Sequence, residues 1–183
     1  MSKASTIHKN WTLFLDRDGV INEKIDNDYV KNWSEFKFID GAIQAISILS
    51  DFFDTIIIVT NQRGVGRKIM TELDLLSIHK SMIDEIVSNS GRIDKIYYCK
   101  DILDSSLCRK PNTGMAIQAK LDFPHIDFNK SVMVGDSISD MNFGKKLGMT
   151  TFMIEKNYNH NNLLYDKKFK SLLDCSNFLN KSL

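Results

Sequence analysis

Two aspartates follow an apolar run near the start of the chain. Residues 12–15 are mostly apolar, and Asp16 and Asp18 come directly after them, followed by Gly19. A strand with this ending presents two carboxylates at its carboxyl end, where a glycine lets the backbone turn tightly. Two such carboxylates can act as a nucleophile and an acid–base group, or they can bind a hard cation. The simpler alternative is that one aspartate caps a turn.

A second acidic pair follows a later apolar run. Asp136 ends the stretch 131–136, and Asp140 comes four residues further on. If both runs are strands of one parallel sheet, Asp16, Asp18 and Asp136 meet at the same edge. Three carboxylates in one place repel one another unless a cation lies among them, and oxygen ligands without His or Cys suit Mg²⁺. We therefore expect a magnesium site here.

Polar and basic residues follow two other segments. Thr60 and Asn61 end a β-branched run, where a hydroxyl and an amide either satisfy the backbone of a turn or bind a ligand. Arg109 and Lys110 precede a predicted helix, and a basic pair in such a loop is usually solvated surface. Beside an acidic cluster, however, positive charge is required if a phosphate ester is to bind. Thr60 and Lys110 are therefore expected to contact phosphate.

The elements that must position these groups alternate along the chain. Short apolar runs alternate with longer helical patterns, which is typical of βαβ units and a parallel sheet. We expect a doubly wound α/β fold with about five parallel strands and helices on both faces. The predicted strands are residues 12–16, 55–60, 93–98, 131–135 and 150–154. The predicted helices are residues 41–53, 72–89, 113–121 and 138–147, the second of them capped by Thr71.

The whole chain has the composition of an ordinary globular protein. It has 183 residues, of which 43% are hydrophobic and 26% charged, so one domain with one sizeable core is expected. We expect this domain to span residues 1–183, with the core at about 11–155. A C-terminal extension at 157–183 is expected to add a short helix and no chemistry. A monomer is expected.

Charge and cysteine content restrict the possible partners. The formal net charge of +1 gives no electrostatic reason to bind nucleic acid or an anionic membrane. No run approaches the roughly 20 apolar residues of a membrane span, and the first ten residues lack the apolar core of a secretion signal. Three cysteines, an odd and small number, are typical of a compartment in which thiols stay reduced. These observations predict a cytoplasmic protein.

The motifs, in their order along the chain, resemble those of the haloacid dehalogenase phosphatases. That family has Asp-x-Asp-Gly, then Ser or Thr, then Lys, then Gly-Asp-x-x-x-Asp, each after its own strand. The corresponding residues are Asp16-Arg17-Asp18-Gly19, Thr60, Lys110 and Gly135-Asp136-Ser137-Ile138-Ser139-Asp140, and the resemblance spans about residues 11–155. Four motifs in the right order are far more specific than any one of them.

The resemblance implies a mechanism and a set of ligands. Asp16 would attack phosphorus and form an aspartyl-phosphate. Asp18 would protonate the leaving alkoxide and then deprotonate the attacking water. Mg²⁺ would be held by Asp16, Asp136 and the backbone carbonyl of Asp18. Thr60 and Lys110 would bind phosphoryl oxygens.

A finer resemblance is to the branch that contains the D-glycero-D-manno-heptose 1,7-bisphosphate phosphatases and the histidinol-phosphate phosphatases. The shared stretches are residues 16–22, 29–30, 36–41, 96–99, 108–111 and 114–115, and the stretch 60–67 favours the heptose enzymes. The resemblance implies that a small phosphorylated sugar, heptose 1,7-bisphosphate, loses its C7 phosphate in the synthesis of heptose nucleotide precursors of lipopolysaccharide. Arg109 would bind the distal part of the substrate, Asn61 would orient the sugar, and Asp140 would orient the groups that bind the metal. No separate cap domain is expected, because the loops 23–38, 62–70 and 99–109 are too short for one.

Two departures from these relatives affect the expected site. Relatives usually have a zinc loop with four Cys and His ligands. Here Cys99 and Cys108 are present, but Asp101 and Ser106 stand at the other two ligand positions and the loop is shorter, so no zinc is expected. Ser137 stands where many relatives have Lys or Arg, which removes one positive charge.

Several alternatives remain open. A histidinol-phosphate phosphatase or a phosphatase for another small sugar phosphate would use the same motifs, although Arg109 and Arg67 would repel the ammonium of histidinol phosphate. A polynucleotide phosphatase would require a basic face, against which the net charge of +1 argues. A phosphoacceptor signalling or binding module is the non-enzyme alternative. In such modules, however, the phosphorylated aspartate follows a later strand, whereas Asp16 ends the first predicted strand.

Overall fold

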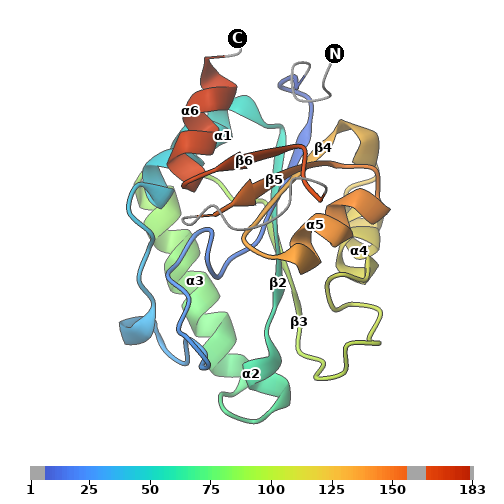
Figure 1. The fold of residues 1–183 in the computed structure, drawn as a ribbon. Coiled ribbons are helices and arrows are strands. Elements are labelled where there is room, and N and C mark those ends of the chain that lie inside the picture. The colour runs from blue at the N-terminus through green and yellow to red at the C-terminus, as the bar shows by residue number, and fades with distance from the viewer. Residues whose placement is uncertain (1–6, 156–163, 182–183) are drawn as a thin grey trace.

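Six parallel strands form a single sheet at the centre of the protein (Figure 1). The computed structural model describes residues 7–155 and 164–181. The strand order is β3-β2-β1-β4-β5-β6, and all neighbours are parallel. The strands are β1 (Thr12–Leu15), β2 (Thr55–Asn61), β3 (Lys95–Cys99), β4 (Ser131–Gly135), β5 (Thr150–Ile154) and β6 (Lys167–Phe169). The five predicted strands are confirmed to within two residues at their ends, and β6 is a sixth that was not predicted.

Helices cover both faces of this sheet, as predicted. On one face lie α1 (Ala42–Phe52), α3 (Glu72–Ser88) and α6 (Leu172–Asn180), and on the other lie α4 (Gly114–Asp122) and α5 (Ile138–Lys146) (Figure 1). The connections also contain the one-turn helix α2 (Arg63–Gly66) and the 3-10 helices η2 (Trp33–Glu35) and η3 (Phe128–Lys130). None of the helices in the described part of the chain has both the length and the apolar composition that a bilayer crossing requires.

The central strands are buried on both of their faces. In β1, Leu13 and Leu15 pack into the cluster that includes α1, α3 and α6, whereas Phe14 packs into the cluster that includes α4 and α5. All three side chains are fully buried. The residues 56–59 of β2 divide between the two clusters in the same alternating way. A strand that is covered on both faces can therefore be a continuous apolar run in the sequence.

Capping boxes begin the helices α3 and α5. Thr71 Oγ1 accepts a hydrogen bond from the backbone N of Asp74, and the carboxylate of Asp74 accepts one from the backbone N of Thr71. The predicted cap at Thr71 is therefore confirmed. Ser137 and Asp140 form the equivalent pair at the start of α5. This second box holds the carboxylate of Asp140 next to the end of β4.

The C-terminal extension completes one side of the fold. The strand β6 pairs with β5, and α6 packs against α1. Leu172, Cys175 and Leu179 of α6 are buried in the same cluster as β1. The short terminal helix predicted for this extension is confirmed, and it contributes directly to the hydrophobic core.

The carboxyl ends of all six strands lie at one edge of the sheet, because every strand is parallel to its neighbours. For β2, this end lies at the lower side of the view in Figure 1, where the strand leads into α2. In parallel α/β sheets, ligands bind at this edge. Among the described residues, the connections that leave it consist of loops, short helices and the helices that pack on the sheet, and none forms a separate cap domain.

Candidate active site

Asp16 lies in a buried position directly after β1. Asp16 is 8% exposed, and its Oδ1 accepts a hydrogen bond from the backbone N of Arg17 at 2.7 Å. The Nζ of Lys110 lies 2.9 Å from the same oxygen and 2.6 Å from Oδ1 of Asp140. Lys110 is itself buried, so it ties the loop after β3 to the carboxylates that follow β1 and β4.

Three carboxylates crowd together at this edge of the sheet. Asp16, Asp136 and Asp140 each offer an oxygen, and these oxygens lie within 4.8 Å of one another. Burial raises the pKa of Asp16 to about 7, with the charge of Asp140 adding to the rise and that of Lys110 opposing it. Burial also raises the pKa of Asp136, against the charge of Lys24. Oδ1 of Asp136 is buried and has no hydrogen-bond partner among the described residues. A divalent cation would relieve this crowding, so the residues present fit Mg²⁺.

The loop after Asp18 passes close to Asp136 because residue 19 is a glycine. Gly19 has a φ of +89°, in the region that favours glycine. A Cβ at this position would lie 2.1 Å from Oδ2 of Asp136, which is a severe clash. Gly19 therefore allows the backbone to turn after Asp18 and allows this loop to approach Asp136 closely.

Asp140 lies behind the pocket rather than at its surface. Its Oδ2 accepts hydrogen bonds from the backbone N of Ser137 at 3.1 Å and from Oγ of Ser137 at 2.5 Å. Its Oδ1 faces Lys110, and the side chain is fully buried. This position suits the orienting role expected of Asp140, because the carboxylate holds both Lys110 and the start of α5.

The carboxylate of Asp18 is held by three side chains. Arg17 Nη2 donates to both oxygens, at 2.8 and 3.0 Å. Asn22 Nδ2 donates to Oδ1 at 2.9 Å, and Gln62 Nε2 donates to Oδ2 at 2.8 Å. Burial alone would raise the pKa of Asp18, but the charge of Arg17 and the hydrogen bonds from all three side chains lower it. Arg17, Asn22 and Gln62 were not predicted as site residues, although all three lie in stretches that the resemblance had already singled out.

A histidine of α3 supports Arg17. The Nη1 of Arg17 lies 3.1 Å from the Nε2 of His79, and the two residues are 1% and 4% exposed. Burial lowers the pKa of His79 to about 3, and the charge of Arg17 contributes to the shift. The imidazole is therefore neutral near pH 7, so that Nε2 accepts a hydrogen bond from the guanidinium. His79 is 62 residues from Arg17 in the sequence, and no motif connected the two.

The end of β2 delivers a hydroxyl and an amide to the same edge. Thr60 is buried, and its Oγ1 accepts a hydrogen bond from Nε2 of Gln62 at 2.9 Å. Asn61 makes two hydrogen bonds with the backbone of Lys110, since its Oδ1 accepts from N at 3.0 Å and its Nδ2 donates to O at 3.1 Å. Asn61 therefore fixes the backbone that presents Lys110 to the carboxylates.

Arg109 lies beside an acidic residue of its own loop. Its Nε donates to Oδ1 of Asp104 at 3.1 Å, and Arg63 pairs with the same carboxylate. The Nη1 of Arg109 is buried and has no hydrogen-bond partner among the described residues. Arg67, the other cation expected near the substrate, donates to the hydroxyl of Tyr29 at 3.1 Å and does not line the pocket.

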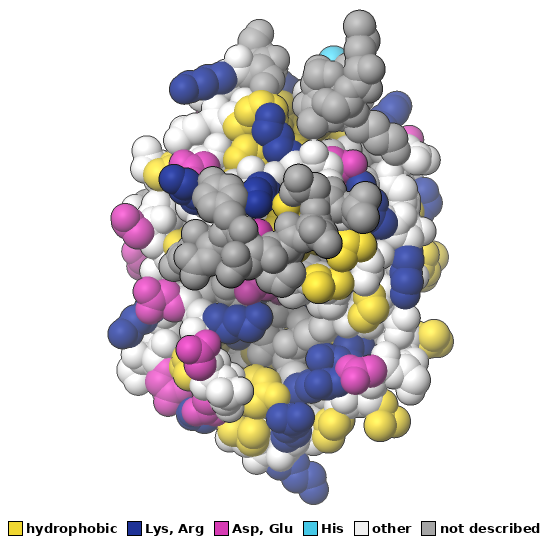
Figure 2. Space-filling view, viewed as in Figure 1, with side chains coloured by type: hydrophobic (Ala, Val, Ile, Leu, Met, Phe, Trp, Pro, Cys, Tyr) yellow, Lys and Arg dark blue, Asp and Glu magenta, His cyan; other side chains and the backbone are white. Residues whose placement is uncertain are grey.

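One pocket joins the loops that follow β1, β2, β3 and β4. Seven of the predicted site residues line it, namely Asp16, Asp18, Thr60, Asn61, Arg109, Lys110 and Asp136, whereas Asp140 does not. Lys24 also lines the pocket, and its Nζ lies 3.1 Å from Oδ2 of Asp136. In the lower half of Figure 2, Lys and Arg side chains border a hollow over this end of the molecule. The pocket therefore combines an acidic floor with cations, as a phosphate ester requires.

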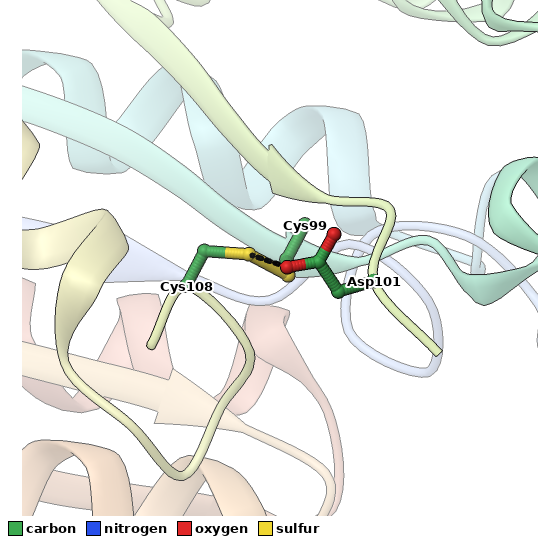
Figure 3. A group of neighbouring side chains, drawn as sticks. All are labelled: Cys99, Asp101 and Cys108. Carbon is green, nitrogen blue, oxygen red and sulfur yellow. Dashed lines mark hydrogen bonds between the residues drawn. A yellow bond between two sulfur atoms is a disulfide. The ribbon is translucent and has the colours of Figure 1, made fainter. Parts of the chain in front are cut away.

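The loop after β3 begins and ends with cysteines. Cys99 and Cys108 form a disulfide with their Cα atoms 5.6 Å apart, and Oδ2 of Asp101 lies 3.5 Å from Sγ of Cys108 (Figure 3). This disulfide differs from the reduced thiols that the cysteine content had suggested. A disulfide sulfur is not a thiolate, so Cys99, Asp101 and Cys108 could offer three metal ligands only after reduction. The absence of zinc stays a prediction.

The parallel sheet, and the carboxylates and cations at its carboxyl edge, define a phosphatase of the haloacid dehalogenase type. A family model described as HAD-hydrolase-like matches residues 107–171. The chain is 35% identical over 170 residues to the D-glycero-alpha-D-manno-heptose-1,7-bisphosphate 7-phosphatase of Campylobacter jejuni, covering 93% of this chain and 96% of that one. The enzyme of the same name from Mycobacterium bovis is 38% identical over 132 residues, which are 72% of this chain and 70% of that one.

A solved structure agrees with these sequence matches. The D,D-heptose 1,7-bisphosphate phosphatase of B. bronchiseptica, complexed with magnesium and phosphate, superposes with a TM-score of 0.84 at 26% identity, covering 94% of this chain and 99% of that one. The chain belongs to the family of the heptose 1,7-bisphosphate 7-phosphatases, and it is a phosphatase.

Proposed function

We propose that this chain removes the C7 phosphate of D-glycero-D-manno-heptose 1,7-bisphosphate. The observation that carries the proposal is that two cations with different surroundings, Lys110 and Arg109, line one pocket. Lys110 is buried against Asp16 and Asp140, where the reacting phosphate must lie. Arg109 lines the same pocket, and its Nη1 has no hydrogen-bond partner in the described part of the chain. A bisphosphate offers one anion to each cation, and the names of the relatives support the same substrate.

The first half of the proposed reaction forms a covalent intermediate. A carboxylate oxygen of Asp16 attacks phosphorus, and Thr60 and Lys110 bind the phosphoryl oxygens. Asp18 protonates the leaving sugar alkoxide. The lowered pKa of Asp18 means that it is ionised in the free protein, but an incoming phosphate dianion raises the proton affinity of a nearby carboxylate. Asp18 can therefore carry a proton when the substrate is bound.

The second half releases phosphate and restores Asp16. Asp18, now ionised, deprotonates the water that attacks the aspartyl-phosphate. The carboxylate of Asp18 must thus donate a proton in the first step and accept one in the second, at the same position in the site. The hydrogen bonds from Arg17, Asn22 and Gln62 keep the carboxylate there during both steps.

Magnesium is the cation that this set of residues fits. Asp16, Asp136 and the backbone carbonyl of Asp18 would hold it. When bound, it would neutralise the charge that builds up as a carboxylate meets a phosphate. The magnesium and phosphate in the structure of the B. bronchiseptica enzyme support this proposal. The proposed mechanism does not use zinc.

We also propose that residues 1–183 act as one monomeric domain in the cytoplasm, without a nucleic-acid or membrane partner. The single sheet, which the C-terminal extension completes through β6, supports one domain. Its substrate would then be a small phosphorylated sugar.

A phosphate-release assay over a panel of substrates tests the proposed function. The panel contains heptose 1,7-bisphosphate, heptose 7-phosphate, histidinol phosphate and several common sugar phosphates, each with MgCl₂. We expect the highest kcat/KM for heptose 1,7-bisphosphate, with the C1 phosphate retained in the product as seen by phosphorus NMR. A higher kcat/KM for histidinol phosphate would contradict the proposal.

A further inference from the structure

The side chain of Lys24 occupies a defined place in the loop after β1. The backbone just before it is fixed, because the backbone N of Glu23 donates to the carbonyl of Lys37 at 2.8 Å and Asn22 forms bridges with Asp18 and Phe38. From this position Lys24 lines the pocket, and its side chain remains 57% exposed. The ammonium group is therefore held near the site and is accessible to a ligand.

The ammonium of Lys24 lies against a carboxylate that the proposed mechanism assigns to Mg²⁺. Its Nζ is 3.1 Å from Oδ2 of Asp136. A divalent cation bound to Asp136 would repel this second cation at the same oxygen atoms. The four-carbon side chain of a lysine is flexible, so the ammonium can turn toward another anion in the pocket. A phosphate group of the substrate is the anion that the pocket would then contain.

The pocket is also lined by Asp136, Ser137 and Ser139, and none of these three side chains is a cation. Lys110 forms an ion pair with Asp16, and the charge of Arg109 is partly neutralised by Asp104. Arg17, which also lines the pocket, is paired with Asp18. Among the described residues, a second phosphate would consequently meet only one partly neutralised cation if Arg109 acted alone.

We propose that Lys24 binds the phosphate that is not hydrolysed, together with Arg109, so that two cations share this group. This inference rests on the proposed function, since it requires a substrate with two phosphates. Lys24 is then a residue that determines specificity and has no part in the bond-breaking steps. Its contact is made to a remote group of the substrate, so its loss is expected mainly in KM.

The test compares two substrates that differ only in the second phosphate. Lys24→Ala is expected to lower kcat/KM for heptose 1,7-bisphosphate by about tenfold and to change that for heptose 7-phosphate by less than about threefold, because a charge-assisted contact is lost from one substrate alone. Lys24→Arg keeps the charge and is expected to stay within about threefold of wild type. Lys37→Ala is the matched control, because it removes an exposed lysine of the same loop that does not line the pocket.

Two results would overturn the proposal. One is an equal effect of Lys24→Ala on both substrates, or no effect on either. The other is a lower Mg²⁺ requirement for both substrates without any change in their ratio, which would mean that Lys24 only competes with the metal at Asp136. A failure of the proposed function is seen separately, in wild type alone, as an absence of activity on the bisphosphate.

Discussion

The Nη1 of Arg17 lies 3.1 Å from the Nε2 of His79, so a buried imidazole of α3 supports the guanidinium that holds Asp18. The pKa of His79 is about 3 in the folded protein, against 6.5 for an ordinary histidine. Between these two pH values the unfolded chain binds more protons than the folded one. The stability that depends on a neutral His79 is therefore present above about pH 6.5 and is lost progressively as the pH falls toward about 3.

The substitution His79→Gln keeps a hydrogen-bond acceptor for Arg17 and removes this titration. Relative to the variant, the free energy of unfolding of wild type should fall by about 1.4 kcal/mol for each pH unit below pH 6. Urea denaturation of both proteins at pH 7, 6 and 5 measures the difference. His125→Gln, at an exposed histidine, should follow wild type. Parallel pH profiles of wild type and His79→Gln would show that the imidazole is not held neutral.

Asp16→Asn is expected to abolish turnover and to leave the fold intact. The amide is nearly isosteric with the carboxylate, but it cannot attack phosphorus or balance the charge of a metal ion. Steady-state phosphate release measures the activity, and circular dichroism confirms the fold. Normal activity of the variant would exclude the covalent mechanism.

Asp18→Asn should separate the two halves of the reaction. Slow phosphorylation of Asp16 should remain, while hydrolysis of the aspartyl-phosphate should slow by about 10²–10⁴-fold, the usual contribution of a general base. Rapid-quench kinetics with labelled substrate should show phosphorylated protein accumulating. If the variant turned over at the wild-type rate without an intermediate, another group would have to serve as the acid and base.

Metal analysis tests two expectations from the sequence, that the enzyme requires Mg²⁺ and that it binds no zinc. Activity should be lost in chelator and should return on addition of Mg²⁺, because the crowded oxygens of Asp16, Asp136 and Asp140 suit a divalent cation, which would neutralise the charge of an approaching phosphate. Elemental analysis of protein purified with a reductant should find no stoichiometric zinc. One zinc per chain would show that Cys99, Asp101 and Cys108 recruit a fourth ligand once the disulfide is reduced.

Arg109→Ala should narrow the preference for a bisphosphate over histidinol phosphate. A guanidinium can bind a phosphate through two parallel hydrogen bonds, and loss of such a contact costs roughly 1.5–3 kcal/mol, or about tenfold to over a hundredfold in kcat/KM. Arg63→Ala is a matched control, since Arg63 pairs with the same Asp104 but does not line the pocket. Equal losses on every substrate in the Arg109 variant would indicate a structural role only.

The main elements of the fold could be predicted because the central strands are buried on both faces. The stretch 56–59 is continuous and β-branched, and it forms the middle of β2. The strand β6 could not be predicted in this way. Its three residues, Lys167–Phe169, have no apolar run, and they become a strand only because they pair with the edge of β5.

The residues at the ends of the strands could also be predicted, and the structure brings Asp16, Thr60, Lys110 and Asp136 into one pocket. The contacts between side chains that are far apart in the sequence could not be predicted. His79 repeats at helical spacing with buried apolar residues of α3, so the sequence gives no indication that its ring faces Arg17. Roles in the reaction, including those of Asp16 and Asp18, remain predictions until the variants are measured.

The position of the reacting groups relative to their strands has a consequence for how the enzyme can evolve. Asp16 and Asp136 each lie one residue beyond a strand, and Thr60 is the last residue but one of β2. Apart from the last residues of β2, the strands contribute apolar side chains that are buried in the core. Substitutions in the connecting loops can therefore change which ester is preferred while the scaffold keeps its folding free energy. Substitutions in the interior, in contrast, should alter how much active enzyme accumulates and leave the ranking of substrates unchanged.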